Sequence, residues 1–191
     1  MRRSRSVLAL TALLLSACAT SAEHSPLTTT FAPVAPHQDA HAAWWGDNRW
    51  RYPTDAAAEA AYQALVTSQA PWPEWHQVDV KPLPVGLRFQ MALSPGQPTD
   101  RPGGFGTFDL IPDVAYVRRA LAVKVAWKPA IDRVVTYEVT DPLPVDTGTV
   151  GPQIDADGPA YLPGGGSQLE MKVPAPERIR HLKVIEVREI H

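Results

Sequence analysis

The sequence predicts an α+β domain in which short, mostly antiparallel strands dominate and one or two helices lie on the N-terminal side. Three segments alternate apolar and polar residues with the period of a strand, at 87–91, Arg133–Val139 and 182–187. One segment, Asp55–Thr67, has the composition and the start signals of a helix. Twenty prolines and twelve glycines favour short strands and ordered loops over a helix bundle.

The N-terminus has the organisation of a secretory signal. Residues 1–5 are basic, and the apolar run 7–15 is too short to span a bilayer as a stable helix. The run ends in Leu-Ser-Ala-Cys, which resembles the lipobox of bacterial lipoproteins, where the cysteine is lipidated and becomes the first residue. We therefore expect a signal peptide at 1–17 and a lipid on Cys18. An ordinary signal peptide with an incidental cysteine is the alternative.

Export and anchoring set the expected location and organisation. The protein is expected in the bacterial cell envelope, periplasmic or at the surface, held to a membrane through Cys18. Cys18 is the single cysteine, so no disulfide forms within the chain. Residues 18–41 are rich in Ser, Thr, Pro and Ala, which is typical of a flexible tether. Residues 42–191 then form one globular domain.

The charge of the chain excludes one class of partner. The formal net charge is −2. Removal of residues 1–17, which carry three arginines and no acidic residue, lowers it to −5. A mildly acidic chain without a basic run argues against nucleic-acid binding as the main task.

The N-terminal part of the predicted domain combines tryptophans with one helix. Pro53 precedes the helix at Asp55–Thr67, Thr54 or Asp55 can cap it, and its apolar stripe consists of Tyr62, Leu65 and Val66. Five tryptophans flank this helix: Trp44, Trp45, Trp50, Trp72 and Trp75. They either cover a small core, which we favour, or form a surface that binds a sugar or another ring.

From residue 78 onward the chain changes to short alternating runs. The three runs named above are each bounded by Pro, Gly or Asp turn signals, which favour antiparallel strands. Residues 114–124 fit either a short helix or a strand.

Most generic catalytic patterns are absent from the sequence. It contains no G-x-S-x-G, no H-E-x-x-H, no Walker loop and no paired-cysteine site, and its six histidines are scattered, so no metal is expected. One segment, residues 161–171, stands out because Gly164, Gly165 and Gly166 precede Gln168 and Glu170.

The chemistry of that segment suits a ribose. Consecutive glycines permit positive φ, and their N–H groups can form an anion site. Gln168 and Glu170 would share one face of a strand. The amide can hydrogen-bond hydroxyl groups, and the carboxylate can stabilise positive charge at an anomeric carbon. A plain glycine turn is the alternative.

The surrounding sequence strengthens this interpretation through a resemblance. From about residue 72 to the end, the chain resembles the C-terminal domain of the tuberculosis necrotizing toxin and its relatives, which are NAD glycohydrolases. The matching pieces follow one another in the family's order: 83–86, Asp100-Arg101, Gly103-Gly104, Gly-x-Phe at 106–108, 111–113, Arg119-Ala-Leu, Tyr-Glu-Val at 137–139, 141–145, Gly148, Pro-Gly-Gly-Gly-Ser-Gln at 163–168, and a closing strand near 184–187.

The resemblance implies a site and a reaction. Arg101 and Arg119 match two family arginines, and guanidinium groups suit the phosphates of a dinucleotide. Phe108 matches an aromatic position that can stack on nicotinamide or adenine, and Gln168 matches a glutamine implicated in catalysis. The implied NAD-binding residues are thus Arg101, Phe108, Gly164, Gly165 and Gly166, and the implied catalytic residues are Gln168, Arg119 and Glu170.

The implied products are nicotinamide and ADP-ribose, with NAD as the substrate and no cofactor or metal. Surface arginines and a core phenylalanine are the structural alternatives for Arg101, Arg119 and Phe108. An immunity protein would be expected if the enzyme could harm its own producer.

Departures from the family pattern keep other functions open. Pro102 follows Asp-Arg where the family has an aromatic residue, Val135 and Thr136 stand where a histidine is expected, and Leu169 follows the glutamine in place of an aromatic residue. A non-catalytic envelope lipoprotein that uses the same scaffold to bind a partner is the alternative. An ADP-ribosyltransferase is a variant of the enzymatic reading.

Overall fold

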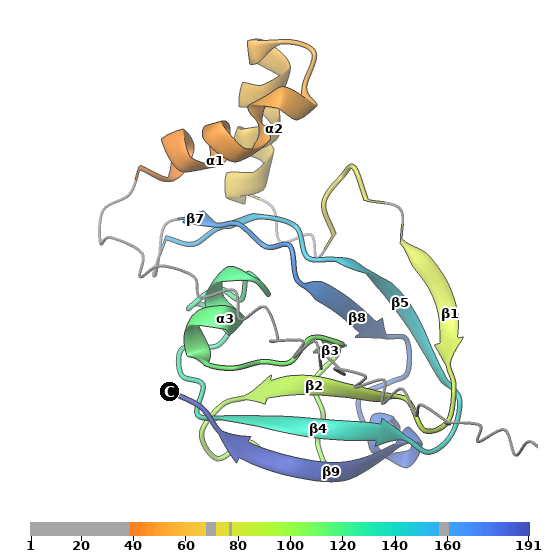
Figure 1. Cartoon of the computed structure of the whole chain (residues 1–191). Helices are drawn as coiled ribbons and strands as arrows, with labels where there is room; N and C mark the ends of the chain where they lie inside the picture. Colours follow the sequence, from red (N-terminus) through yellow and green to blue (C-terminus); the bar gives the residue numbers. More distant parts are fainter. Residues whose placement is uncertain (1–38, 68–71, 77, 157–160) are drawn as a thin grey trace, which may run out of the picture. The chain divides into compact units, whose positions relative to one another are not determined.

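The computed structural model of the chain describes residues 39–67, 72–76, 78–156 and 161–191. In these ranges helices come first and antiparallel strands dominate the rest, which confirms the predicted α+β class (Figure 1). Cys18, the predicted signal peptide and most of the predicted tether lie outside the described residues. No helix within the described ranges has the length and apolar character needed to cross a membrane.

Two antiparallel sheets contain most of the strands. The first has the order β1-β5-β8-β3, from Asp79–Leu83, Leu143–Thr149, Ser167–Met171 and Phe105–Gly106. The second has the order β2-β4-β9, from Arg88–Leu93, Arg133–Val139 and Leu182–Glu189. The three runs that the sequence predicted as strands are therefore confirmed, and all three lie side by side in the second sheet (Figure 1).

The main hydrophobic core consists of buried side chains from both sheets. Alternation along β2 buries Phe89, Met91 and Leu93 and leaves the residues between them more exposed. The Phe89 and Tyr137 rings pack with centroids 5.7 Å apart. The Tyr137 hydroxyl donates to the carbonyl of Thr99 at 2.7 Å, and burial raises the pKa of Tyr137 to about 12. Burial of each large apolar side chain contributes about 1.5–3 kcal/mol.

Helix α2 spans Asp55–Thr67, as predicted. Thr54 caps it, because its Oγ1 accepts a hydrogen bond from the N–H of Ala57 at 3.1 Å. Tyr62 and Leu65 pack against a buried cluster, whereas Val66 is 44% exposed. The predicted stripe is therefore right for two of its three members.

A second helix, α1 at Ala40–Asn48, was not predicted as a helix and begins two residues before the expected domain start at 42. The Asp39 carboxylate accepts from the N–H groups of His41 and Ala42 and so caps it. Trp44 is buried against Ala58 and Tyr161, in agreement with the core role expected for the tryptophans, but Trp50 is 71% exposed.

Helix α1 contacts a short hairpin formed by β6, Gln153–Ile154, and β7, Tyr161–Leu162. The Tyr161 hydroxyl donates to Asp47 at 3.0 Å and accepts from the Asn48 amide at 3.1 Å. These polar bonds give one defined arrangement of α1 on the hairpin.

Helix α3, Val114–Arg119, settles the ambiguous segment in favour of a helix. Asp113 caps it through a hydrogen bond from the N–H of Tyr116 at 2.7 Å. Soon after the helix, Ala122 has a φ of 46°, which starts the loop that leads to β4. A short 3₁₀ helix, η1 at Arg49–Arg51, follows α1, and another, η2 at Arg178–His181, precedes β9.

Candidate functional site

The glycine turn before β8 is held from inside the protein. Gly164 and Gly166 donate their N–H groups to the carbonyls of Arg119 and Ala120, both at 2.9 Å. Gly165 donates to the carbonyl of Val150, also at 2.9 Å. The three N–H groups are thus committed to backbone carbonyls, and the expected anion-binding arrangement is not formed. The turn instead joins the end of α3 to the start of β8.

Two of these glycines differ in what a side chain would meet. Gly164 has a φ of +73°, and a Cβ there would lie 2.6 Å from the carbonyl oxygens of Val150 and Gly151. Gly165 has a φ of +98°, but a Cβ there would meet nothing within 4 Å. The turn therefore needs glycine at 164 for space as well as for backbone conformation.

We expect Gly164→Ala to lower the free energy of unfolding by about 3 kcal/mol, and Gly165→Ala by about 1 kcal/mol, because only the first adds a clash to the strain. Chemical denaturation followed by tryptophan fluorescence measures both. Equal losses in the two variants would contradict the packing role of Gly164.

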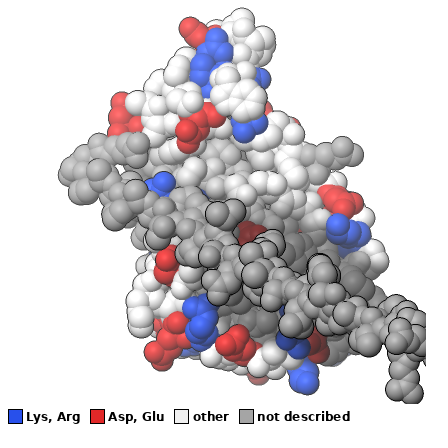
Figure 2. Space-filling model, in the orientation of Figure 1, with Lys and Arg blue, Asp and Glu red and all other residues white. Residues whose placement is uncertain are grey.

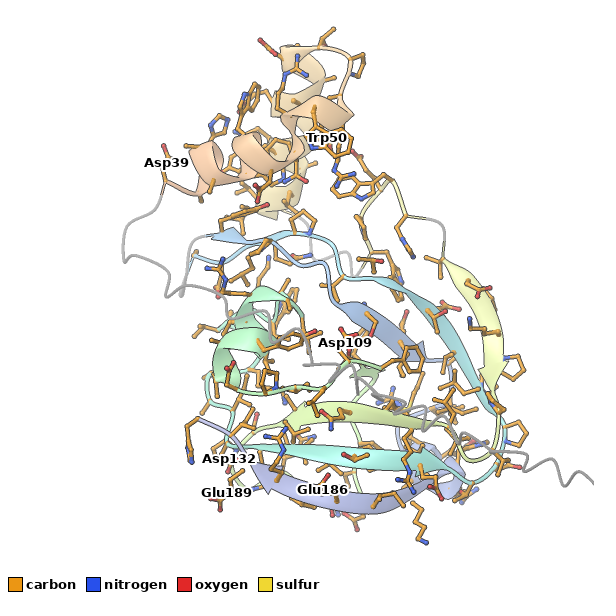
Figure 3. All side chains as sticks on the ribbon, viewed as in Figure 1. Asp39, Trp50, Asp109, Asp132, Glu186 and Glu189 are labelled. Carbon is orange, nitrogen blue, oxygen red and sulfur yellow. The ribbon has the colours of Figure 1, made fainter. Side chains whose placement is uncertain are left out.

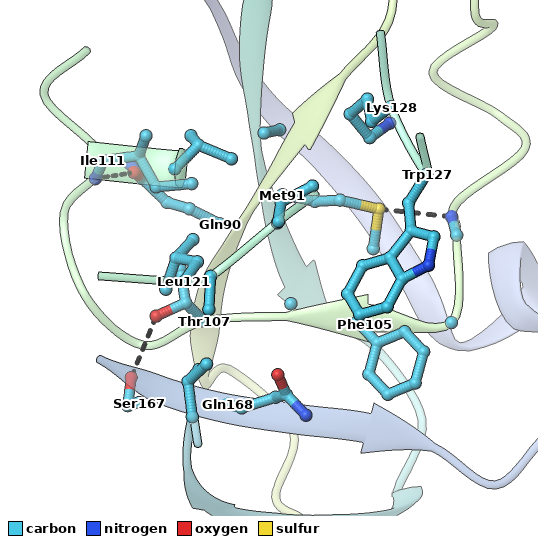
Figure 4. Close-up of a pocket in the computed structure, with 18 of the residues that line it drawn as sticks. Gln90, Met91, Phe105, Thr107, Ile111, Leu121, Trp127, Lys128, Ser167 and Gln168 are labelled. Atoms are coloured by element: carbon cyan, nitrogen blue, oxygen red, sulfur yellow. Dashed lines mark hydrogen bonds between the residues drawn. The ribbon is translucent and has the colours of Figure 1, made fainter. Parts of the chain in front are cut away.

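A cavity of about 420 Å³ opens beside this turn. Its walls come from β2, from residues 103–107 around β3, from residues 121–128 after α3, and from the start of β8 (Figure 4). Gln168 is in the wall, and most of the remaining wall is apolar. The volume lies in the range of small-molecule sites, and an apolar cavity with a few polar groups is the usual form of such sites.

Strand register places an aromatic ring beside Gln168. In β3, Phe105 pairs directly with Glu170, two residues from Gln168 on β8. Phe105 and Gln168 therefore project from one face of adjacent strands as diagonal neighbours. Phe105 is 46% exposed and lines the cavity. The strand also confirms that Gln168 and Glu170 share a face, as their spacing predicted.

A second aromatic ring reaches the same cavity from the loop after α3. Trp127 is 43% exposed, and its ring lines the same cavity as that of Phe105 (Figure 4). The Lys124 ammonium lies 5.0 Å from the centre of the Trp127 ring. Two partly exposed rings in the wall of one cavity suit a planar heteroaromatic ligand.

Buried charges fix the loop that carries Trp127. The Arg118 guanidinium donates to the carbonyls of Val123 at 2.9 Å, Lys128 at 2.6 Å and Pro129 at 3.3 Å. The buried Asp155 carboxylate accepts from the N–H of Val125 at 2.7 Å. Arg118 is 9% exposed, so these bonds are shielded from water and give the loop a defined path.

Lys128 brings a cation to the wall of the cavity. Its Nζ donates to Gln97 at 3.2 Å and to Ser94 at 3.3 Å. Burial lowers the pKa of Lys128, the nearby Arg118 lowers it further, and Asp132 opposes this. Among the residues that line the cavity, Lys128 supplies an ammonium group. This group can pair with a phosphate of a ligand.

Asp109, which is half-buried, organises the start of β8 (Figure 3). Its Oδ2 accepts from the N–H of Ser167 at 2.7 Å and from the Tyr116 hydroxyl at 2.9 Å. Burial alone would raise the pKa of Asp109, but these hydrogen bonds, with weaker help from Thr107, outweigh burial and lower it. Burial and the same carboxylate raise the pKa of Tyr116. Asp109 thereby holds the residue next to Gln168.

Asp109→Asn is expected to lower the free energy of unfolding by about 1–2 kcal/mol at pH 7, because a charged acceptor is lost. The carboxylate has a lowered pKa in the folded state, so its contribution exists above the unfolded value of about 3.9 and disappears as pH falls through the folded pKa. Urea denaturation should show the two proteins converging below about pH 4. Asp79→Asn, at an exposed ion pair, is the matched control, and a pH-independent difference for Asp109→Asn would contradict the prediction.

Of the predicted residues, the cavity wall includes Gln168 and leaves out the side chains of Arg101, Phe108, Arg119 and Glu170. Gln168 is therefore the one of these residues that lines this cavity. Arg101 is exposed, Phe108 is 40% exposed outside this wall, and Arg119 meets the glycine turn through its carbonyl. Whether any of them touches NAD stays a prediction.

Glu170 lies among charged groups, two residues further along the same face of β8. Its Oε2 is 3.5 Å from the Lys172 Nζ, which also meets Asp146 at 2.9 Å. A neutralised carboxylate outside the cavity wall is poorly placed to act on a substrate held beside Gln168.

Sequence reasoning missed Phe105, Trp127, Lys128 and Asp109. Phe105 stands in Gly-Gly-Phe-Gly, and the glycines that flank it were a signal for an exposed ring on a short strand. Trp127 and Lys128 lie in a loop whose path depends on Arg118 and Asp155, residues distant in sequence from one another, so no local pattern marked them.

On the face shown in Figure 2, acidic and basic residues are interspersed, with no large area of one sign among the coloured residues. Within the described ranges, no group of three or more His, Cys, Asp or Glu side chains is arranged to hold a metal ion.

Comparisons with known proteins find similarity in structure. No protein-family model and no curated protein sequence matches the chain. The structure of Tne2 in complex with Tni2 is similar with a TM-score of 0.52 and 26% identity, over 62% of this chain and 97% of the matched chain.

Two further solved structures match less closely. The structure of Tse6 in complex with Tsi6 matches with a TM-score of 0.41 and 18% identity, over 78% of this chain and 99% of the matched chain. Rhs1-CT in complex with its cognate immunity protein RhsI1 matches with a TM-score of 0.37 and 17% identity, over 73% of this chain and 98% of the matched chain.

Proposed function

We propose that the protein is an NAD(P)⁺ glycohydrolase that cleaves the bond between nicotinamide and ribose to give nicotinamide and ADP-ribose, and that it acts as a toxin-like enzyme. The observation that carries the proposal is the position of Gln168 in the wall of the 420 Å³ cavity, with Phe105 and Trp127 beside it. The similarity to the structure of Tne2 in complex with Tni2 supports the choice of scaffold.

The proposed mechanism needs orientation more than acid catalysis. The nicotinamide ring of NAD⁺ carries a positive charge and leaves as neutral nicotinamide. The leaving group therefore requires no proton. The Gln168 carboxamide would hold the hydroxyl groups of the nicotinamide ribose while the glycosidic bond lengthens. Phe105 and Trp127 would bind the planar ring, and Lys128 would offset the charge of the phosphates. Water then attacks the anomeric carbon and gives its proton to solvent.

Location and partners belong to the same proposal. The enzyme would be exported and held in the cell envelope by a lipid on Cys18, and it would work without a cofactor. An immunity protein would bind it in the producing cell, and the similar structure of Tne2, which is a complex with Tni2, supports a protein partner. Mass spectrometry of the chain purified from membranes tests the anchor. Lipidation of Cys18 adds acyl mass, and cleavage before Cys18 removes residues 1–17.

The activity is tested by incubating the purified chain with NAD⁺ and following nicotinamide and ADP-ribose by chromatography. Nicotinamide without free ADP-ribose, together with labelled protein, would identify a transferase instead. No nicotinamide at high protein concentration would overturn the enzymatic proposal and leave a non-catalytic binding protein.

Trp127→Ala is expected to raise the KM for NAD⁺ about tenfold, the effect of losing about 1.4 kcal/mol of ring contact, with a smaller change in kcat. Trp50→Ala is the matched control, because Trp50 is 71% exposed and does not line this cavity. An unchanged KM in Trp127→Ala would place the substrate ring elsewhere.

A further inference from the structure

A second cavity, of about 260 Å³, lies between the N-terminal helices and the segment 151–153. Its wall contains four aromatic residues, Trp44, Tyr52, Trp72 and Trp75. Two polar side chains, Glu74 and Gln153, complete the part of the wall that can hydrogen-bond. Gln153 also lines the first cavity, but none of the other five does.

One donor in this wall has no acceptor. The Trp44 ring is 1% exposed, and its Nε1 is buried without a hydrogen-bond partner among the described residues. An indole N–H is a donor only, and its burial without an acceptor costs free energy. Because Trp44 is 1% exposed and its Nε1 is closed off from solvent, a ligand in the cavity does not reach this donor, and Trp44 forms the packed floor of the cavity.

The wall also contains a hydrogen-bond acceptor, the Glu74 carboxylate. Glu74 accepts a hydrogen bond from the Tyr52 hydroxyl at 2.7 Å. Burial, and then this bond to Glu74, raises the pKa of Tyr52, so the hydroxyl remains a donor. A carboxylate has about four lone-pair sites, so Glu74 can accept further hydrogen bonds from a ligand.

These features narrow the class of ligand. The wall contains no lysine, arginine or histidine, which disfavours phosphates and other anions. The aromatic rings favour a ligand with an apolar face. The volume of the cavity suits a ligand of one ring better than an extended chain. An organic cation would suit the rings and Glu74, but the Arg51 guanidinium already lies 4.4 Å from the centre of the Trp75 ring and would repel a second cation there. A sugar ring has an apolar face together with hydroxyl groups that donate and accept.

We propose that this cavity is a binding site for a single neutral sugar ring, separate from the Gln168 cavity. Trp72 and Trp75 stack on the C–H face of the sugar, and Glu74 accepts hydrogen bonds from its hydroxyl groups. The site gives the N-terminal helices, which precede the family-like region, a binding role of their own.

Isothermal titration of the whole chain with three neutral probes tests the proposal: methyl α-glucopyranoside, methyl N-acetyl-β-glucosaminide and methyl β-ribofuranoside. We expect saturable binding of at least one probe, weakened about tenfold in Glu74→Gln, a loss of about 1.4 kcal/mol, and abolished in Trp72→Ala. Preference for the ribofuranoside would identify a nucleotide ribose as the source of the sugar, and preference for a pyranoside would identify a glycan.

Two controls separate this site from the rest of the protein. Trp50→Ala and Gln168→Ala should bind the probe as the wild type does, so this result does not depend on nicotinamide release. No saturation with any probe up to its solubility limit would overturn the proposal. So would binding that survives Trp72→Ala, or saturable binding of tetramethylammonium in place of the sugars. Glu74→Gln, at an exposed position, tests the site even if Trp72→Ala fails to fold.

Discussion

Replacing Gln168 with alanine is expected to lower the rate of nicotinamide release at saturating NAD⁺ about 100- to 1,000-fold, the effect of losing one oriented hydrogen-bonding group in an active site. The carboxamide is half-buried in the wall of the 420 Å³ cavity, beside Phe105 on the neighbouring strand. The KM should change little, because the ring and the phosphates would still be held by Trp127, Phe105 and Lys128. Steady-state kinetics with purified protein measures both constants.

A structural explanation for such a loss can be excluded with controls. The unfolding midpoint of Gln168→Ala should stay within about 4 °C of the wild type, the shift that about 1 kcal/mol produces in a domain of this size. Gln63→Ala, at an exposed glutamine on α2 that bonds Glu59, should leave both rate and stability unchanged. Full activity in Gln168→Ala would contradict the site, although another residue in the same protein could still carry the reaction.

Glu170 offers a sharper comparison, because the sequence assigned it a catalytic role and the structure places it next to Lys172. If the carboxamide alone orients the ribose, Glu170→Gln retains most of the rate that Gln168→Ala loses. The alternation of β8 explains why the sequence could not separate the two residues. Period-two spacing put both on one face, while the charges around Glu170 depend on Lys172 and on Asp146 of β5, which shares that lysine.

The sequence identified the second sheet well because its strands carry their own pattern. In β4, Arg133–Val139, apolar and polar residues alternate strongly enough to be read without any partner strand. The strands of the first sheet were harder to predict from the sequence. β3 has two residues, and β1 is mostly exposed, so their pairing depends on contacts between distant segments. Helix α1 was missed because its tryptophans show no clear stripe, and its burial depends on Tyr161, far along the chain.

The candidate site was predicted in part for a related reason. Gln168 follows a recognisable glycine turn, and the structure places it in a cavity. The glycines themselves were expected to bind an anion, yet their N–H groups complete bonds to α3 and to Val150. A run of glycines predicts an unusual backbone conformation. It does not predict whether the glycine N–H groups bind a ligand or nearby backbone carbonyls, because that depends on which residues pack against the turn.

Replacing Arg118 with alanine is expected to cost the folded state about 4 kcal/mol, because it leaves three shielded carbonyls without their shared donor and removes a buried side chain. The guanidinium bonds Val123, Lys128 and Pro129 and so closes the loop that carries Trp127. For a domain of this size the unfolding midpoint should fall by about 10 °C. Guanidinium denaturation followed by tryptophan fluorescence gives the free energy directly.

The reason for a cost this large can be checked against a matched arginine. Arg88 pairs with Glu138 at the surface, where an ion pair contributes at most about 1 kcal/mol, so Arg88→Ala should be nearly neutral. Arg118→Lys keeps the charge but cannot reach three carbonyls at once, and it should fall between the two. Because the loop also positions Lys128, a folded Arg118 variant should bind NAD⁺ more weakly at an unchanged kcat. If Arg118→Ala and Arg88→Ala unfold at the same denaturant concentration, the loop is held by other contacts and the cavity wall does not depend on Arg118.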